Sequence, residues 1–166
     1  MILGILSDTH DNAANTRRAL AVFKQRHVEF IIHCGDITTP EMVKLFDGWP
    51  AAFVFGNLDK AEANLIAAAR QLSEPASMGH RYIGLVGGAS VAAYHGNDDE
   101  YLDTLIVSGQ YDYVFYGHTH LRRDEKIGRT RVINPGSLGG RKEKTRSVCV
   151  LTLPDGAAQF IEVDGG

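Results

Sequence analysis

The chain has 166 residues, of which 44% are hydrophobic and 22% charged, and its formal net charge is −3. This length suits one domain with a sizeable core, so a single domain over residues 1–166 is expected. The small negative charge gives no general field for binding nucleic acid, and no apolar run approaches the roughly 18 residues of a membrane-spanning helix.

The N-terminal run and the two cysteines favour a protein of the cytoplasm. Ile2 to Leu6 is a core-type run without the basic segment and cleavage site of a signal peptide. Cys34 and Cys149 each lie in an apolar run and form no Cys-x-x-Cys pair, so two buried free thiols are expected. Free thiols fit a reducing compartment.

The first half of the chain alternates between strand and helix signals. Three apolar runs predict strands, at Ile2–Ser7, Phe30–Cys34 and Ala51–Phe55. Each run is followed by a residue that can cap a helix, namely Asn12, Thr39 and Asp59. The helices are expected over residues 13–26, for a few residues from 40, and over about 60–71. This alternation predicts parallel strands with helices packed on the sheet.

The second half is richer in strands. Gly87-Gly88 between two strand-like runs is typical of a hairpin, and Asn97 or Asp98 can cap a helix that ends near Val107. The strands expected here are Tyr82–Val86, Ala89–Tyr94, Tyr111–Tyr116, Arg122–Ile127, Thr130–Asn134, Ser147–Leu153 and Ala157–Val163. The fold class is therefore α/β with α+β character in the second half, where an antiparallel part can form a second sheet.

Five short polar motifs follow apolar runs and carry side chains that can bind metal. These candidate ligands are Asp8, His10, Asp36, Asn57, His95, His118 and His120. In an open parallel sheet, ligand sites gather beyond the carboxyl ends of the strands, so the motifs are expected to converge. Mixed carboxylate and imidazole ligands suit transition-metal ions, with Mn²⁺ expected first and Fe, Zn, Ni or Co as alternatives.

A charge count indicates the chemistry of such a site. Two divalent ions, the carboxylates of Asp8 and Asp36 and one bridging hydroxide sum to about +1, which attracts an anion. Two metals about 3.5–4 Å apart can stabilise both attack and departure at phosphorus. The motifs therefore predict hydrolysis of a phosphoester by in-line attack of a metal-bridging hydroxide.

Together the motifs resemble those of the calcineurin-like metallophosphoesterases. The matching blocks are Asp8-x-His10, Gly35-Asp36, Gly56-Asn57-x-Asp59, His95-Gly96 and Gly117-His118-x-His120, and Asn134-Pro135-Gly136-Ser137 resembles the small YfcE-type phosphodiesterase branch. The resemblance implies a four-layer αββα sandwich with two central mixed sheets. It also implies one metal held by Asp8, His10, Asp36 and His120, and a second held by Asp36, Asn57, His95 and His118, with Asp36 bridging.

One position departs from the wider family. Many members carry a histidine after Gly-Asn that stabilises or protonates the leaving group, whereas this chain has Leu58. General acid assistance is worth about 10²–10⁴-fold in rate, so the protein is expected to act on diesters with good leaving groups or to use another proton donor. Asp59 remains and is expected to orient Asn57 or nearby water.

The predicted function is a phosphodiesterase for a small diester, in which Asn57, His95 and Asp36 take part in the reaction itself. Two alternatives stay open, a non-catalytic protein-interaction scaffold of the same fold and a phosphomonoesterase. The complete ligand set favours an enzyme, and neither a nucleic-acid platform nor a membrane partner is indicated. Whether the chain forms a homo-oligomer stays open.

The remaining polar residues receive structural interpretations. His33 lies within a strand and is expected either to be packed there or to support a ligand from behind, whereas His27 and His80 are assigned to the surface or to loops without a role. Arg141 in the segment Gly139–Lys144 could contact a phosphate, but a solvated loop is the preferred interpretation.

Overall fold

The computed structural model describes residues 1–140 and 145–163, and within them eleven strands form two sheets. The six-stranded sheet has the order β11-β10-β1-β2-β3-β4, with bounds Ala157–Glu162, Ser147–Thr152, Ile2–Leu6, Phe30–His33, Ala51–Val54 and Ala76–Gly79. The five-stranded sheet has the order β5-β6-β7-β9-β8, with bounds Arg81–Val86, Ala89–Tyr94, Tyr113–Phe115, Thr130–Asn134 and Arg123–Ile127. The described helices are α1 (Ala13–Gln25), α2 (Pro40–Lys44), α3 (Glu62–Ala69) and α4 (Asp99–Val107).

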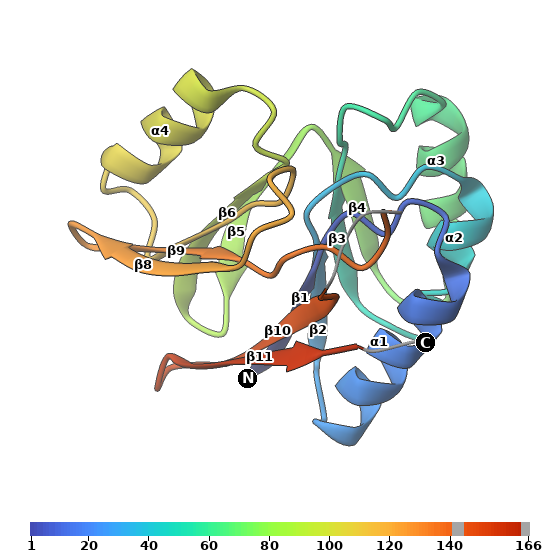
Figure 1. Ribbon diagram of the computed structural model, residues 1–166, viewed down its shortest axis with the longest axis horizontal. Helices are drawn as coiled ribbons and strands as arrows, with labels where there is room; N and C mark the ends of the chain where they lie inside the picture. Colours follow the sequence, from blue (N-terminus) through green and yellow to red (C-terminus); the bar gives the residue numbers. More distant parts are fainter. Residues whose placement is uncertain (141–144, 164–166) are drawn as a thin grey trace.

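The two sheets stack face to face between outer helices, which confirms the four-layer αββα sandwich (Figure 1). Helices α1, α2 and α3 cover the six-stranded sheet, where Phe23 and Phe53 belong to the shared core. Cys34, Cys149 and Phe115 belong to the core between the sheets, and both cysteines are buried free thiols as predicted. Helix α4 covers the outer face of the five-stranded sheet.

Both sheets are mixed, and their parallel parts explain how a site can form. Strands β1 to β4 are parallel to one another, while β10 pairs antiparallel with β1 and β11. In the second sheet β6, β7 and β9 are parallel, and hairpins add β5 and β8 at the edges. The loops after parallel strands therefore leave each sheet at its carboxyl end.

Two of the predicted helix caps are confirmed. The side chains of Asn12 and Asp98 accept hydrogen bonds from the backbone N–H groups of Asn15 and Tyr101. Thr39 precedes α2 without a side-chain cap, because its hydroxyl donates to Asp11 at 3.1 Å. None of the described helices is long and apolar enough to cross a membrane.

Asp59 was wrongly predicted to cap a helix. Helix α3 begins three residues later, and the Asp59 carboxylate accepts hydrogen bonds from the backbone N–H groups of Asp36, Gly56 and Thr38 instead. A buried carboxylate is better satisfied by three tertiary donors than by one helix terminus, so the fold overrides the local preference.

Strand β4 was not predicted from the sequence. Its residues, Ala76 to Gly79, follow a proline and show no clear apolar alternation. Their extended conformation comes from parallel pairing with β3 at the edge of the sheet. This pairing is a tertiary effect that a local pattern does not encode.

Candidate metal centre

The candidate ligands all follow strands and gather at one end of the sandwich. The strands and the ligands that follow them are β1 with Asp8 and His10, β2 with Asp36, β3 with Asn57, β6 with His95, and β7 with His118 and His120. Backbone hydrogen bonds join these loops, from Asp8 N to Gly35 O at 2.9 Å and from Gly117 N to His95 O at 2.9 Å. Both sheets therefore contribute to one site.

The first group of donors surrounds Asp8. Its Oδ1 atom lies 3.1 Å from Nε2 of His120 and 3.6 Å from Nε2 of His10. The two imidazole Nε2 atoms are 3.3 Å apart. These three ligand atoms lie within 4.8 Å of one another, which is the convergence that a metal ion requires.

The second group surrounds His95. Its Nε2 atom lies 3.5 Å from Oδ2 of Asp36 and 3.0 Å from Oδ1 of Asn57. The Nδ1 atom of His118 is 3.1 Å from the same Asn57 oxygen. Asp36 Oδ2 also lies 3.9 Å from Nε2 of His10, so this carboxylate stands between the two groups.

The chemistry of these donors fits divalent metal ions. Imidazole nitrogens face one another and face carboxylate oxygens across distances of 3.1–3.9 Å. A cation placed among them would accept the lone pairs of both ligand types. Nitrogen and oxygen donors together are the set that transition-metal ions prefer.

The two carboxylates are buried, yet hydrogen bonding keeps them ionised. Burial acts to raise the pKa of Asp8, but hydrogen bonds with His10, His120 and Ser7 and the charge of His95 together outweigh it and hold this pKa well below its usual range. Burial likewise acts to raise the pKa of Asp36, but the hydrogen bond and charge of His95, together with the backbone N–H of Leu58, outweigh it, so that this pKa is lowered. Ionised carboxylates are the form that binds metal.

His95 is fully buried, and its imidazole interacts with the carboxylate of Asp36. Burial acts to lower the pKa of its imidazole, but the hydrogen bond with Asp36 and the charges of Asp8 and Asp36 together outweigh this effect and raise the pKa. Its Nδ1 atom lies 2.7 Å from the carbonyl oxygen of Cys34. A hydrogen bond to that carbonyl orients the ring and directs Nε2 to the site.

Five of the seven candidate ligands have a left-handed backbone. Their φ angles are 54° at Asp8, 42° at His10, 57° at Asp36, 63° at His118 and 61° at His120. This conformation is unfavourable for residues other than glycine, at roughly 1–2 kcal/mol each, and it clusters at functional sites in proteins.

Two glycines of the motifs are required by close contact with the ligands. A Cβ atom at Gly56 would collide with the Asp36 carboxylate and backbone nitrogen. A Cβ atom at Gly117 would collide with Ser7 Oγ and, at 2.7 Å, with Oδ2 of Asp8. These loops therefore run directly against the side chains that they position.

Asp59 holds together the two loops that carry Asp36 and Asn57. Its Oδ2 atom accepts the N–H groups of Asp36 and Gly56 at 2.9 and 2.7 Å, and its Oδ1 atom accepts that of Thr38 at 2.7 Å. It was expected to orient Asn57 or nearby water, whereas the contacts seen are with the backbone of Gly56, which precedes Asn57, and with the loop that carries Asp36. Burial raises the pKa of Asp59.

Further supporting contacts come from Ser7 and from the 134–137 turn. Ser7 Oγ donates to Oδ2 of Asp8 at 2.5 Å, a role that no sequence motif indicated. Asn134 Nδ2 donates to Gly117 O at 2.8 Å, and Ser137 Oγ donates to Asp8 O at 3.2 Å. These contacts hold the 134–137 turn against the loops that carry Asp8 and His118.

The other histidines lie outside the two donor groups. His33 is fully buried, its Nδ1 atom accepts the N–H of Gly35 at 3.1 Å, and burial lowers its pKa to about 4. It is therefore a packed, neutral residue, as expected. His27 is exposed, and His80 lies at the surface beside Glu62. The segment 141–144, which contains Arg141, lies outside the described residues.

Two cavities flank the metal centre. One of about 390 Å³, here called the Asn57 cavity, is lined by Asn57, Phe55, Lys60, His80, Tyr94 and their neighbours. The other, of about 480 Å³, is lined by residues 10–14 together with Gly140 and Arg146. A substrate that reaches the ligands therefore has room on either side.

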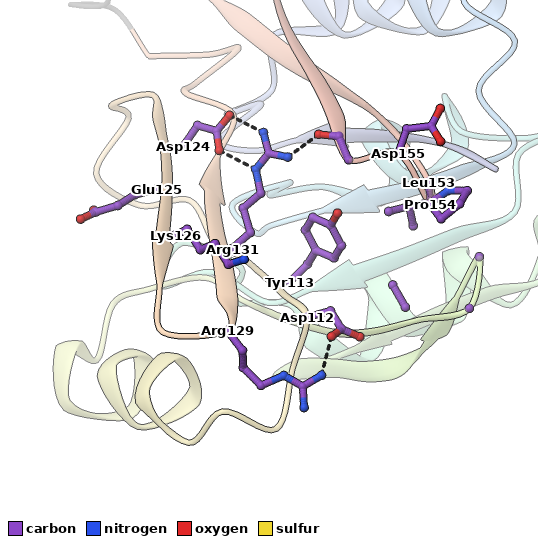
Figure 2. A pocket seen from close by; sticks show the side chains of 14 residues that line it. Asp112, Tyr113, Asp124, Glu125, Lys126, Arg129, Arg131, Leu153, Pro154 and Asp155 are labelled. Carbon is purple, nitrogen blue, oxygen red and sulfur yellow. Dashed lines mark hydrogen bonds and ion pairs between the residues drawn. The ribbon is translucent and has the colours of Figure 1, made fainter.

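A larger cavity, of about 700 Å³, lies at the opposite end of the sandwich (Figure 2). Arg131 donates from Nε and Nη2 to the two oxygens of Asp124, at 2.7 and 2.8 Å, and also to the carbonyl of Gly156. Arg129 pairs with Asp112 at 2.6 Å. These charges are paired with one another, and we interpret the region as a junction between the sheets.

Comparison with known proteins shows to which family the chain belongs. Residues 1–156 match the calcineurin-like phosphoesterase superfamily domain. The chain is 34% identical over 142 residues to phosphodiesterase MJ0936 of Methanocaldococcus jannaschii, which covers 84% of this chain and 86% of that protein. It is 30% identical to a probable metallophosphoesterase of Methanothermobacter thermautotrophicus, over 92% of this chain and 86% of the relative.

Solved structures agree with this match. A structure described as a novel archaeal phosphodiesterase superposes with a TM-score of 0.93 at 30% identity, covering 98% of this chain and 99% of that one. YfcE, a phosphoesterase from E. coli, superposes with a TM-score of 0.67 at 20% identity, over 99% and 100% of the two chains, and supports the fold alone. The chain therefore belongs to the calcineurin-like phosphoesterase superfamily and is a metal-dependent phosphoesterase with a YfcE-type fold.

Proposed function

We propose that the protein is a two-metal phosphodiesterase that hydrolyses a small phosphodiester. The observation that carries this proposal is the position of Asp36, whose Oδ2 atom lies 3.9 Å from His10 Nε2 and 3.5 Å from His95 Nε2. A carboxylate between two groups of donors is the arrangement expected of a bridging ligand.

In this proposal each of the seven ligands has a defined place. The first metal is held by Asp8, His10, Asp36 and His120, and the second by Asp36, Asn57, His95 and His118. Divalent ions bound there supply an activated water and stabilise the charge that develops at phosphorus. Mixed oxygen and nitrogen donors suit transition-metal ions, and among these Mn²⁺ is the first candidate, with Fe, Zn, Ni or Co as alternatives.

Three ligands are proposed to act in the reaction as well as in metal binding. Asp36 fixes the relative position of the two donor groups. His95 is held rigidly by burial and by the contact of its Nδ1 with Cys34 O at 2.7 Å. The carboxamide of Asn57 turns its oxygen towards two imidazoles, and its N–H groups are proposed to hold a phosphoryl oxygen.

Two lines of support favour a diester substrate. Relatives that cover most of the chain are named phosphodiesterases. The position after Asn57 is Leu58, 47% exposed, which cannot protonate a poor leaving group. The Asn57 cavity and its counterpart across the site are each a few hundred Å³, the size expected for small-molecule sites.

The buried free thiols of Cys34 and Cys149 support a cytoplasmic location.

The proposal is tested with purified protein that has been stripped of metal and reloaded with Mn²⁺, Zn²⁺ or Mg²⁺. We expect two ions per chain by elemental analysis, and faster hydrolysis of bis(p-nitrophenyl) phosphate than of p-nitrophenyl phosphate. Full activity with one ion per chain would contradict the two-metal centre. Faster hydrolysis of the monoester would favour a phosphomonoesterase, and protein that binds no ion would favour a scaffold.

A further inference from the structure

The fourth parallel strand of the six-stranded sheet is also followed by a residue that can do chemistry. Candidate ligands follow β1, β2 and β3, and His80 follows β4 directly. The backbone N–H of Phe55 donates to the carbonyl of Gly79 at 2.8 Å, which keeps the ends of β3 and β4 level. The topology that brings Asn57 to the site therefore places His80 next to it, one strand further out.

His80 and Asn57 line the same cavity. The Asn57 cavity, about 390 Å³, extends from the candidate metal ligand Asn57 to His80 and is walled by Phe55 and Tyr94. A phosphodiester bound at the metals has two arms, and this cavity can accommodate one of them. His80 would then face that arm.

The His80 ring is oriented by two contacts and remains accessible. Its Nε2 atom lies 3.4 Å from Oε2 of Glu62, at the start of α3. Its ring packs against Phe55 with centroids 5.2 Å apart and an interplanar angle of 63°. The side chain is nevertheless 76% exposed, so a substrate can reach it. An imidazole paired with a carboxylate at a cavity wall is a typical arrangement for proton transfer.

We propose that the Asn57 cavity receives the leaving arm of the diester and that His80 protonates the departing oxygen. This proposal rests on the phosphodiesterase function proposed above. It supplies the proton donor that Leu58 cannot provide, since an imidazolium whose Nε2–H faces Glu62 retains Nδ1–H for the substrate.

The step balances without any further reactant. The oxygen of the attacking water forms a bond to phosphorus as the bond to the leaving oxygen breaks. The electron pair of that bond stays on the leaving oxygen, which takes the Nδ1 proton of His80 and departs as an alcohol. The neutral imidazole then regains from solvent a proton equivalent to the one that the water lost.

Other ionisable groups around the cavity are less suited to this step. They are Asp59, Lys60, Glu62 and Tyr94. Asp59 is occupied by three backbone N–H groups, and burial raises the pKa of Tyr94 above its usual value of 10.0. Histidine is the side chain that ordinarily exchanges protons near neutral pH.

The test compares wild type with His80→Asn, Glu62→Gln and His27→Asn on a series of diesters whose leaving groups become progressively poorer. In His80→Asn we expect little loss with p-nitrophenolate as leaving group, and a loss of about 10²–10⁴-fold in kcat with an alkoxide. The basic limb of the pH profile of kcat should disappear in His80→Asn, and Glu62→Gln, which removes a carboxylate that orients the ring, should show a smaller loss with the alkoxide than His80→Asn. His27→Asn, a change at an exposed histidine outside the site, should match wild type.

Metal analysis of His80→Asn should show the wild-type content, so that any loss is assigned to the proton donor. A loss of equal size for every leaving group, or no loss at all, would overturn the role of His80 while leaving the phosphodiesterase function intact. A wild-type protein that hydrolyses no diester with any divalent ion would overturn both proposals.

Discussion

Charged side chains are arranged differently at the two ends of the sandwich. At the carboxyl end of the parallel strands, Asp8 and His95 are fully buried and imidazole nitrogens face one another at 3.3 Å. At the opposite end, Arg131 and Asp124 form a two-point ion pair that remains partly exposed (Figure 2). The second arrangement pairs opposite charges with each other, whereas the first brings several imidazole nitrogens and carboxylate oxygens together at one point, as a metal site would require.

The backbone shows the same contrast. Left-handed residues such as Asp8, Asp36 and His118 cluster in the loops of the metal centre. At the opposite end the left-handed residues that line the cavity are Gly87, Gly88 and Gly156, for which this conformation is not costly. The comparison indicates that the metal centre is maintained at a cost in stability, and that substitutions at the two ends should separate activity from stability.

The largest effect is expected for Asp36→Asn. Loss of the proposed bridging charge should lower kcat/KM for a diester and the metal affinity by at least about 100-fold. The stability of the metal-free protein should fall modestly, because the lowered pKa of Asp36 indicates that the fold stabilises its carboxylate, while Asn tolerates the left-handed backbone. Enzyme kinetics, elemental analysis and thermal unfolding measure the three quantities. Asp124→Asn, at the other end, serves as the control and should retain full activity.

The next effect is expected from Gly56→Ala compared with Gly88→Ala. The added methyl group at Gly56 would collide with Asp36. The backbone and the Asp36 side chain must move apart to avoid this collision, so we expect the free energy of unfolding to fall by about 1–3 kcal/mol and Asp36 to be displaced. At Gly88, where φ is +84° and nothing lies within 4 Å of the added atom, only the backbone preference is lost, at about 1 kcal/mol. Denaturant unfolding and a diester assay test both. Equal activity of the two variants would contradict the close contact at Gly56.

At the opposite end, Arg131→Ala should affect stability alone. It removes the hydrogen bonds to Asp124 and to the carbonyl of Gly156, and we expect a loss of about 2 kcal/mol in the free energy of unfolding. Arg129→Ala is the matched control, because Arg129 is 60% exposed and its pair with Asp112 should contribute less than about 1 kcal/mol. A drop in diester hydrolysis for Arg131→Ala would show that the two ends are coupled.

The smallest effect concerns acid stability. Hydrogen bonds from the backbone and side chain of Ser90, together with Arg129, lower the pKa of Asp112 from 3.8 to about 2. Because the folded pKa is the lower one, this contribution is present above pH 3.8 and is lost as the pH falls towards about 2. The stability difference between wild type and Asp112→Asn should therefore shrink over that range. Unfolding experiments at pH 2–5 measure it, and a constant difference would argue against the lowered pKa.

Most of the candidate site could be located from sequence because its residues follow recognisable strands. Asp8, Asp36 and Asn57 come after apolar runs that the structure confirms as parallel strands β1 to β3. Parallel strands have their carboxyl ends at one edge, so the sequence order already implied convergence. The role of these residues as metal ligands stays a prediction that the proposed experiments test.

Other features depend on contacts that no local pattern contains. The sequence by itself determined the strand–helix order, the polar motifs and the glycines beside them, because these follow from side-chain periodicity and turn chemistry. Only the tertiary structure decided that Ala76–Gly79 is a strand, that Asp59 binds three backbone N–H groups rather than a helix end, and that His80 lines the same cavity as Asn57. In each case the stabilising contacts are made with a segment distant in sequence. These contacts form only when the strands of the sheets come together.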